Sequence, residues 1–173
     1  MSDLEIRFAG NDDVAAIASI SLKTFFDTFA EYNTPENMDS FMNDHFSETR
    51  LSYELEDPSN IFLIAEIEKR LVGYAKLSES PNPNGLDGVS SIEICRIYSI
   101  KDMIGKGVGK SLMQKSIDIA RERNKKVIWL GVWEHNPKAV EFYTKWGFER
   151  FGEHPFILGD DIQTDWLMKK EVS

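Results

Sequence analysis

The sequence predicts an α/β protein in which helices flank a mixed, mostly antiparallel central sheet. Apolar stretches of strand length alternate with amphipathic stretches of helix length along nearly the whole chain. Two of these strands, 60–68 and 70–79, are separated only by Lys69, and a connection this short predicts a hairpin. The later strands are separated by helices, which allows crossover connections and parallel pairing. A mixed sheet accommodates both kinds of connection.

The first third of the chain is expected to hold one strand and two or three helices. Leu4–Ala9 alternates like an edge strand, and the segment 11–13 offers an N-cap with acidic groups for the first helical turn. Apolar residues then recur at helical spacing from Val14 to about residue 32. Thr34, with a proline at the next position, caps a second helix, and a third begins at Ser47.

The middle of the chain contains a loop insert and a strand–loop–helix unit. The segment 80–90 is dense in proline, asparagine and glycine and is predicted to be a loop. Ile92–Ile100 is an apolar strand that leads through a glycine-rich loop into an amphipathic helix from Val108 to about Arg123. At such a helix start, the first backbone N–H groups have no partner within the helix, and they point outward together with the positive end of the helix dipole. The unit therefore predicts a binding site for an anionic group such as phosphate.

The last third alternates strand, helix and two strands. After the buried strand 127–133, a helix is expected with Asn136 as N-cap, a proline at its first position and Gly147 as its end. The strands 148–158 and 163–170 pack either within the monomer or against a second copy, so a homodimer stays open. Without repeats or linkers, the chain is expected to form one domain, residues 1–173.

Charge and composition exclude some classes of partner. A net charge of −9, from 20 basic and 29 acidic residues, argues against nucleic acid and is compatible with a cationic substrate or with simple solubility. No apolar run has the length of a membrane span, and the N-terminus lacks the order of a signal peptide. Cys95 is the only cysteine, which fits a reducing compartment. We expect a cytoplasmic protein without membrane association.

Two common phosphate-binding motifs do not fit the glycine-rich loop. The loop ends in GKS, as the Walker A motif requires, but that motif also needs a glycine at the position of Ile104. It would further need a magnesium-binding aspartate at the end of a second apolar strand, and 127–133 has none. The dinucleotide fingerprint needs a glycine where Lys110 or Leu112 stands. We therefore expect neither an NTPase nor a dinucleotide-binding protein.

A third motif fits better. Gly107-Val108-Gly109 resembles the coenzyme A loop of the GCN5-related N-acetyltransferases, whose motif is Q/R-x-x-G-x-G/A. Ile104 stands where that family has Gln or Arg, although the family's loop holds pyrophosphate mostly through backbone N–H groups. The stretch 136–148, NPKAVEFYTKWGF, matches the family's next block, N-x-x-A-x-x-F-Y-x-x-x-G-F, at every fixed position. The resemblance covers both blocks and the order of elements along nearly the whole chain.

This resemblance implies acetyl-CoA as the cofactor and indicates the residues that hold it. In the family, the fourth and fifth strands splay apart and the pantetheine arm lies between them. The backbone of Ile97, Tyr98 and Ser99 would bond this arm, and the Ile97 N–H would polarise the thioester carbonyl. The remaining residues implied in cofactor binding are Ile104, Gly105, Lys106, Gly107, Val108, Gly109, Lys110, Asn136, Phe142 and Lys145. Asn136 also serves as a helix N-cap, and Lys145 is equally a solvated helical lysine.

Two residues are candidates for proton transfer. Tyr143 matches the tyrosine that family members use as general acid toward the coenzyme A sulfur, or it is a core anchor. Glu93 lies on the central strand near the expected reaction centre and is the candidate base for the ammonium proton, or it is a paired structural charge. Strand alternation places Glu93 on one face with Cys95 and Ile97, and Tyr98 on the other.

A narrower resemblance concerns the acceptor. Segments 24–38, 123–136 and 159–165 look like the PaiA-type spermidine/spermine acetyltransferases, which implies direct transfer to a polyamine in a ternary complex. The candidate walls of a cation site are Phe26, Asp27, Glu31, Tyr32, Trp133 and Glu134. The plainer alternative places Phe26 in the core and the acidic helical residues on a solvated face. None of the three histidines has metal-ligand spacing, and we expect no metal.

Two alternative functions stay open from the sequence. One is acetylation of a different amine, such as a protein N-terminus or an aminoglycoside. The other is an acyl-CoA-binding module without turnover, against which the presence of Tyr143 argues. A long acidic channel would favour the polyamine, and a wide groove would favour a peptide.

Overall fold

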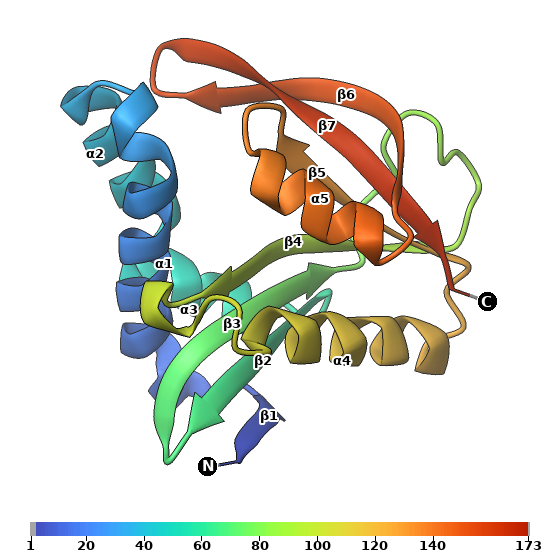
Figure 1. Cartoon of the computed structure of the whole chain (residues 1–173), viewed down its shortest axis with the longest axis horizontal. Helices are drawn as coiled ribbons and strands as arrows, with labels where there is room; N and C mark the ends of the chain where they lie inside the picture. The colour runs from blue at the N-terminus through green and yellow to red at the C-terminus, as the bar shows by residue number, and fades with distance from the viewer. Residues whose placement is uncertain (1–2, 173) are drawn as a thin grey trace.

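The computed structural model describes residues 3–172, which form one seven-stranded sheet flanked by helices (Figure 1). The strand order is β1-β2-β3-β4-β5-β7-β6, so β1 and β6 are the edges. The strands are β1 (Leu4–Phe8), β2 (Asn60–Ile67), β3 (Arg70–Ser78), β4 (Ser91–Ser99), β5 (Val127–Trp133), β6 (Glu149–Leu158) and β7 (Asp161–Glu171). The helices are α1 (Val14–Phe29), α2 (Pro35–His45), α3 (Glu48–Glu56), α4 (Val108–Glu122) and α5 (Pro137–Lys145), with short 3-10 turns η1 (Asn11–Asp13), η2 (Ala30–Tyr32) and η3 (Lys101–Met103).

Neighbouring strands pair antiparallel, except that β4 and β5 are parallel. This confirms the mixed, mostly antiparallel sheet. Glu68 and Lys69 form the turn between β2 and β3, and both have positive φ, at 50° and 65°, as a tight hairpin turn demands. The two C-terminal strands pack within the monomer, where β7 lies between β5 and β6.

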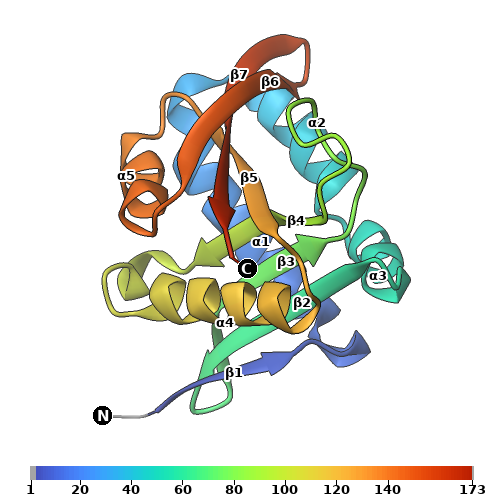
Figure 2. The same ribbon diagram turned by 90° about the vertical axis from the view of Figure 1, so that its right-hand side faces the viewer.

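Helices cover both faces of the sheet (Figure 2). On the α4 face, Leu112 and Ile117 of α4 pack with Ile92 of β4, and residues of α5 pack against the same cluster. On the opposite face, which we call the α1 face, Ile17 of α1 packs with Tyr74 of β3, and α2 and α3 add further contacts. No helix within residues 3–172 is long and apolar enough to cross a membrane.

Several local signals of the sequence are confirmed as helix caps. The side-chain oxygens of Thr34, Ser47 and Asn136 each accept the backbone N–H three residues on, at 3.1 to 3.3 Å. Gly147 follows α5 with φ of 90°, the left-handed conformation that ends a helix. These residues act through their immediate neighbours in sequence, which explains why they could be recognised without the fold.

The start of α1 differs from the expectation. Instead of capping the helix directly, residues 11–13 form the short turn η1, and the Asp13 carboxylate accepts the N–H of Gly10 at 2.8 Å. Asp13 also forms an ion pair with Arg7 of β1 at 2.8 Å, and Arg7 pairs with Glu66 of β2 at 2.9 Å. The acidic segment therefore ties the helix to the edge of the sheet, a contact that depends on the fold.

Candidate active site

The strands β4 and β5 separate halfway along their length. Their parallel pairing ends at Ile94 and Leu130, and beyond this point β4 pairs only with β3 and β5 only with β7. This confirms the predicted splay. The backbone of residues 95–99 thus has no strand partner on its β5 side, and an extended ligand can bond there like an added strand.

A β-bulge marks the start of this gap. Lys76 of β3 pairs with Arg96, but the next residue, Leu77, pairs with Ile94. Cys95 is therefore an extra residue in β4. Bulges bend the strand that carries them, and here the bend coincides with the point where β4 leaves β5.

The bulge also changes which side chains share a face. Ile97 packs in the core beneath α4 together with Ile94, although the two residues are three positions apart. Tyr98 packs on the α1 face. The prediction that Ile97 shares a face with Glu93 and Cys95 is wrong, because strict alternation does not account for an inserted residue.

The glycine-rich loop has open space beside two of its glycines, while the N–H groups of Ile104 and Lys106 are donated within the chain to Lys101 and Met103. Gly105 and Gly107 have φ of 83° and 91°, which glycine adopts without strain. A Cβ at either position would meet nothing within 4 Å. Gly107 is the N-cap of α4 and no side chain caps this helix, so its first N–H groups are available to an anion. Lys106 and Lys110 are exposed beside them, and Ile104, the residue that departs from the family motif, is 67% exposed.

Two other glycines bring the elements around the loop together. A Cβ on Gly73 of β3 would lie 2.6 Å from the carbonyl oxygen of Tyr98 and 2.6 Å from a methyl carbon of Val108. Only glycine therefore lets the start of α4 approach β3 and β4 this closely. On the other side, the Cβ position of Gly109 lies 3.5 Å from the ring of Phe142 in α5. The predicted cofactor segments are thus in contact with one another.

Tyr143 lies in the packed layer between α5 and the sheet. Its ring centroid is 5.5 Å from that of Phe142 and 5.9 Å from that of Phe148. Burial raises the pKa of its phenol, which stays protonated at neutral pH and can donate a proton. Burial also raises the pKa of Tyr98, with a further increase from Tyr74 that Arg96 opposes.

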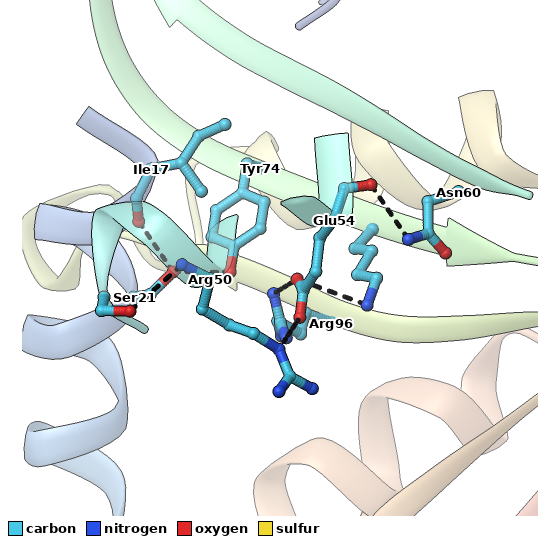
Figure 3. Close-up of polar contacts among 9 residues, drawn as sticks. Ile17, Ser21, Arg50, Glu54, Asn60, Tyr74 and Arg96 are labelled. Atoms are coloured by element: carbon cyan, nitrogen blue, oxygen red, sulfur yellow. Dashed lines mark hydrogen bonds and ion pairs between the residues drawn. The ribbon is translucent and has the colours of Figure 1, made fainter. Parts of the chain in front are cut away.

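A buried carboxylate holds the part of β4 beyond the bulge (Figure 3). Glu54 of α3, with its side chain 9% exposed, accepts two hydrogen bonds from Arg96, at 2.9 and 3.2 Å. It also lies 3.4 Å from the ammonium of Lys76 and 3.3 Å from Arg50. Burial opposes ionisation of Glu54, but these cations outweigh it and hold its pKa below the usual value. This cluster joins α3, β3 and β4 at one point.

A pair of hydroxyl groups beside this cluster fixes the aromatic side chains. Tyr74, which is fully buried, shares a 2.6 Å hydrogen bond with Ser21, and Ser21 donates to the carbonyl oxygen of Ile17 at 2.7 Å. The ring of Tyr98 stands edge-on to that of Tyr74, with centroids 5.5 Å apart. The position of Tyr98 at the gap is therefore set from α1 through Tyr74.

Glu93 lies on β4 just before the bulge. Its carboxylate accepts a hydrogen bond from Ser80 at 3.0 Å, and the residue stands opposite Trp129 in the pairing with β5. The loop that begins at Ser80 packs through the buried Leu86 against Trp129. Burial and the charge of Glu93 raise the pKa of Cys95 to about 12, so this thiol stays protonated and is unsuited to act as a nucleophile.

An aromatic wall lies on the α1 face at the end of β5. Tyr32 and Trp133, both predicted to line the acceptor site, are in contact, with ring centroids 5.2 Å apart. Phe29 lies 5.0 Å from Trp133 and 5.8 Å from Phe156 of β6. The wall thus combines α1, η2, β5 and β6, and the contributions of Phe29 and Phe156 depend on the tertiary structure.

Within residues 3–172, the other predicted acceptor residues, Phe26, Asp27, Glu31 and Glu134, make none of the ring contacts of this wall, and Lys145 was predicted as a cofactor residue. Phe26 is 52% exposed and belongs to none of the hydrophobic clusters within residues 3–172, and Asp27 and Glu31 are exposed. Glu134 and Lys145 line a groove of about 330 Å³ between α5 and β7. The neighbouring residues at the end of β5 therefore diverge, because Trp133 packs toward α1 while Glu134 faces this groove.

Three residues that the sequence did not indicate lie together on the α1 face. His154 and Asp165 are cross-strand partners in β6 and β7, with Nε2 and Oδ2 3.7 Å apart. A Cβ on Gly131 of β5 would lie 3.1 Å from this Nε2 and 3.4 Å from this Oδ2. The available signal was the glycine inside the apolar strand VIWLGVW, since a strand glycine often marks close approach of a ligand or another side chain.

Comparison with known proteins identifies the family. Residues 16–148, more than half of the chain, match the acetyltransferase (GNAT) family. The N-acetyltransferase from the pepI 3′ region of Lactobacillus delbrueckii subsp. lactis is 40% identical over 178 residues, which cover 99% of each chain. The chain belongs to the GNAT family.

Two further matches, one of sequence and one of structure, extend over nearly the whole length of the chain. The spermidine N(1)-acetyltransferase of Thermoplasma acidophilum is 23% identical, with 97% of each chain covered. The crystal structure of the PaiA N-acetyltransferase from Thermoplasma acidophilum in complex with coenzyme A has a TM-score of 0.81 at 21% identity, covering 98% of this chain and 99% of that one. The similarity to the PaiA crystal structure confirms the GNAT fold.

The chain is therefore an acetyl-CoA-dependent N-acetyltransferase. When bound, acetyl-CoA supplies an activated acetyl thioester, and the residues present suit it. The uncapped start of α4 and the open space around Gly105 and Gly107 suit its diphosphate. The unpaired edge of β4 at residues 95–99 suits its extended pantetheine arm.

Proposed function

We propose that this GNAT enzyme acetylates a primary amine of a polyamine such as spermidine or spermine, by direct transfer in a ternary complex with acetyl-CoA. The observation that carries the proposal is the aromatic wall of Phe29, Tyr32 and Trp133 on the α1 face, with Asp165 directly opposite Trp133 in the pairing of β5 and β7. Aromatic faces and carboxylates both stabilise organic ammonium groups. The net charge of −9 adds long-range attraction for a polycation, and the similarity to a spermidine N(1)-acetyltransferase supports the same choice.

We propose for these residues the cofactor-binding roles that the family resemblance implies, and their positions around the gap and the loop support these roles. Residues 104–110 would bind the diphosphate through backbone N–H groups, and residues 97–99 would bond the pantetheine arm. The N–H of Ile97 would donate to the carbonyl oxygen of the thioester, where negative charge develops during transfer. Asn136, Phe142 and Lys145 would complete the cofactor contacts from α5.

The proposed proton transfers use one residue on each side of the gap. Tyr143, whose phenol is protonated at neutral pH, donates a proton to the leaving sulfur. Glu93 on β4 receives a proton from the acceptor ammonium, directly or through a water molecule. The two groups approach the gap from opposite faces of the sheet, so they act without competing for space.

The acceptor is tested by steady-state release of thiol with a panel of amines. The panel contains spermidine, spermine, 1,4-diaminobutane, n-butylamine and a peptide with a free N-terminal alanine. We expect kcat/KM for spermidine or spermine to exceed that for n-butylamine at least about tenfold, because each contact to an additional ammonium group is worth about 1.5–3 kcal/mol. A preference for the peptide or for the monoamine would contradict the polyamine assignment.

The role of Tyr143 is tested by Tyr143→Phe. We expect kcat to fall about 10²-fold while the Kd for coenzyme A stays within about twofold, because only the proton donor is lost. Tyr53→Phe is the matched control, since Tyr53 is 69% exposed on α3. Unaltered turnover in Tyr143→Phe would remove this residue from the mechanism.

A further inference from the structure

Gly131 is exposed to solvent although its strand is central. β5 lies between β4 and β7, and the neighbours of Gly131 in sequence, Leu130 and Val132, are only 1% and 6% exposed. On the α1 face, however, Gly131 has no side chain and lies just beyond the last pair between β4 and β5. We call this exposed part of the sheet surface, which the side-chain ends of His154 and Asp165 approach, the Gly131 trough. It is bordered by Glu93, Trp129, Trp133, His154 and Asp165.

The two acidic residues flank the trough from opposite sides. Asp165 approaches Gly131 from β7, as the 3.4 Å separation from its Cβ position shows. Glu93 approaches from β4, and its negative charge helps to raise the pKa of His154 across the trough. A group that enters between them meets carboxylates on both sides, which suits a cation.

The negative charge of Asp165 has few favourable partners for a carboxylate with so little exposure to solvent. Its side chain is 17% exposed, yet within residues 3–172 the only basic group within ion-pair distance is the Nε2 of His154 at 3.7 Å. A carboxylate withdrawn from water normally requires a close cation or several hydrogen bonds. The arrangement therefore favours a positively charged ligand at this position.

A second, independent observation comes from Trp133, which stands directly opposite Asp165 in the pairing of β5 and β7. Trp133 is 6% exposed, and its indole N–H is buried without an acceptor among residues 3–172. Leaving such a donor unpaired costs about 1–3 kcal/mol, a cost that folded proteins tolerate mainly at functional sites. The indole N–H needs an acceptor, which an ammonium group does not offer, so it marks an unfilled hydrogen-bonding position beside Asp165 and the cation is favoured by the carboxylate alone.

We propose that the ammonium group to be acetylated enters the Gly131 trough and is bound there by the carboxylate of Asp165. In this proposal His154 is a positioning residue: its imidazolium competes with the substrate ammonium for the Asp165 carboxylate. In the reaction, the nitrogen forms the N–C bond as the C–S bond of the thioester breaks. The ammonium nitrogen gives up two protons, of which one is taken up by the leaving sulfur and the other is released. The inference rests on the N-acetyltransferase activity and applies to any primary amine, whichever one the panel favours.

The first test is Asp165→Asn, which removes the charge and keeps the size of the side chain. With the best amine of the panel, we expect KM for the amine to rise about 10- to 100-fold, because a charge-assisted contact is lost, while the Kd for coenzyme A stays within about twofold. Asp161→Asn is the matched control, since Asp161 is exposed on the same strand, and it should leave both values unchanged. An amine KM within about twofold of wild type in Asp165→Asn would overturn the proposal.

The second test is His154→Gln, for which the proposal predicts a change in the amine KM of opposite sign. At pH 6.5, loss of the competing cation should lower KM for the amine about two- to fivefold, the range of a partly exposed ion pair. Structural damage does not tighten substrate binding, so this result also decides the question if Asp165→Asn fails to fold. An unchanged or raised KM in His154→Gln would overturn the proposal, whereas a preference for a monoamine in the panel would contradict only the polyamine assignment.

Discussion

Two carboxylates on the α1 face differ little in exposure and greatly in their partners. Glu54 is 9% exposed and has three cationic groups within 3.4 Å. Asp165 is 17% exposed, and its only basic partner within residues 3–172 is a histidine at 3.7 Å. A buried charge with its full set of partners holds structure in place, and one with too few is ready to bind a ligand. Glu54 fixes β4 beyond the bulge, and Asp165 lies beside the gap that begins at this bulge.

Two strand glycines show the same contrast. The Cβ position of Gly73 is closed off at 2.6 Å by a backbone carbonyl and by a residue of α4. That of Gly131 is approached only by the ends of two side chains, at 3.1 and 3.4 Å, and the residue is exposed. Gly73 allows two elements to pack, whereas Gly131 leaves room on the surface of the sheet.

The largest effect is expected from Glu54→Ala. Removing this carboxylate leaves Arg96 and Lys76 partly buried without their anion, which should lower the free energy of unfolding by about 3–5 kcal/mol. Urea unfolding measures the change. Glu56→Ala is the matched control, because Glu56 is exposed on the same helix and should cost less than about 0.5 kcal/mol. Equal losses in the two variants would show that the Glu54 cluster does not stabilise the fold.

Alanine at the two glycines should separate cofactor binding from acceptor binding. Gly73→Ala must displace the start of α4 or the end of β4, so we expect a loss of about 1–3 kcal/mol in unfolding free energy and a raised Kd for coenzyme A. Gly131→Ala meets only movable side-chain ends, so it should cost less than about 1 kcal/mol and raise KM for the amine instead. Calorimetric titration with coenzyme A and amine kinetics measure the two effects. The same changes in unfolding free energy, coenzyme A Kd and amine KM in both variants would contradict this distinction between the two glycines.

The smallest effects concern the pH dependence of stability. Burial opposes the charge of Glu54, but its cations lower its pKa below 4.5, so its contribution is present above that pH and is lost as pH falls through the folded-state pKa. Asp165 raises the pKa of His154 above 6.5 against the effect of burial, with a further contribution from Glu93. The contribution of His154 is therefore complete below pH 6.5 and is lost as pH rises through the folded-state pKa.

Unfolding free energies of wild type, Glu54→Gln and His154→Gln across pH 3–9 measure both contributions. The difference between wild type and Glu54→Gln should shrink in the acidic range, and that between wild type and His154→Gln should shrink in the alkaline range. The latter should stay below about 1 kcal/mol, since His154 is half exposed and solvent screens its charge. Differences that do not vary with pH would contradict the assigned ionisations.

The sequence by itself determined the order of the elements, the helix caps at Thr34 and Asn136, the glycine-rich loop before α4 and the place of Tyr143 on α5. These features depend on residues that are close in sequence, so periodicity, turn chemistry and a contiguous motif carry the information. The family resemblance extended this to the splay of β4 and β5, because two motif blocks and the order of elements agree over most of the chain.

Only the tertiary structure decided the bulge at Cys95, the partners of Glu54 and the trough over Gly131. Glu54 and Arg96 are 42 residues apart, and Gly131 meets residues of two later strands. An inserted residue leaves the apolar pattern of β4 almost unchanged, yet it alters which side chains share a face. Whether a buried charge is satisfied depends on the cations that long-range strand pairing brings to it, and neither composition nor periodicity records that pairing.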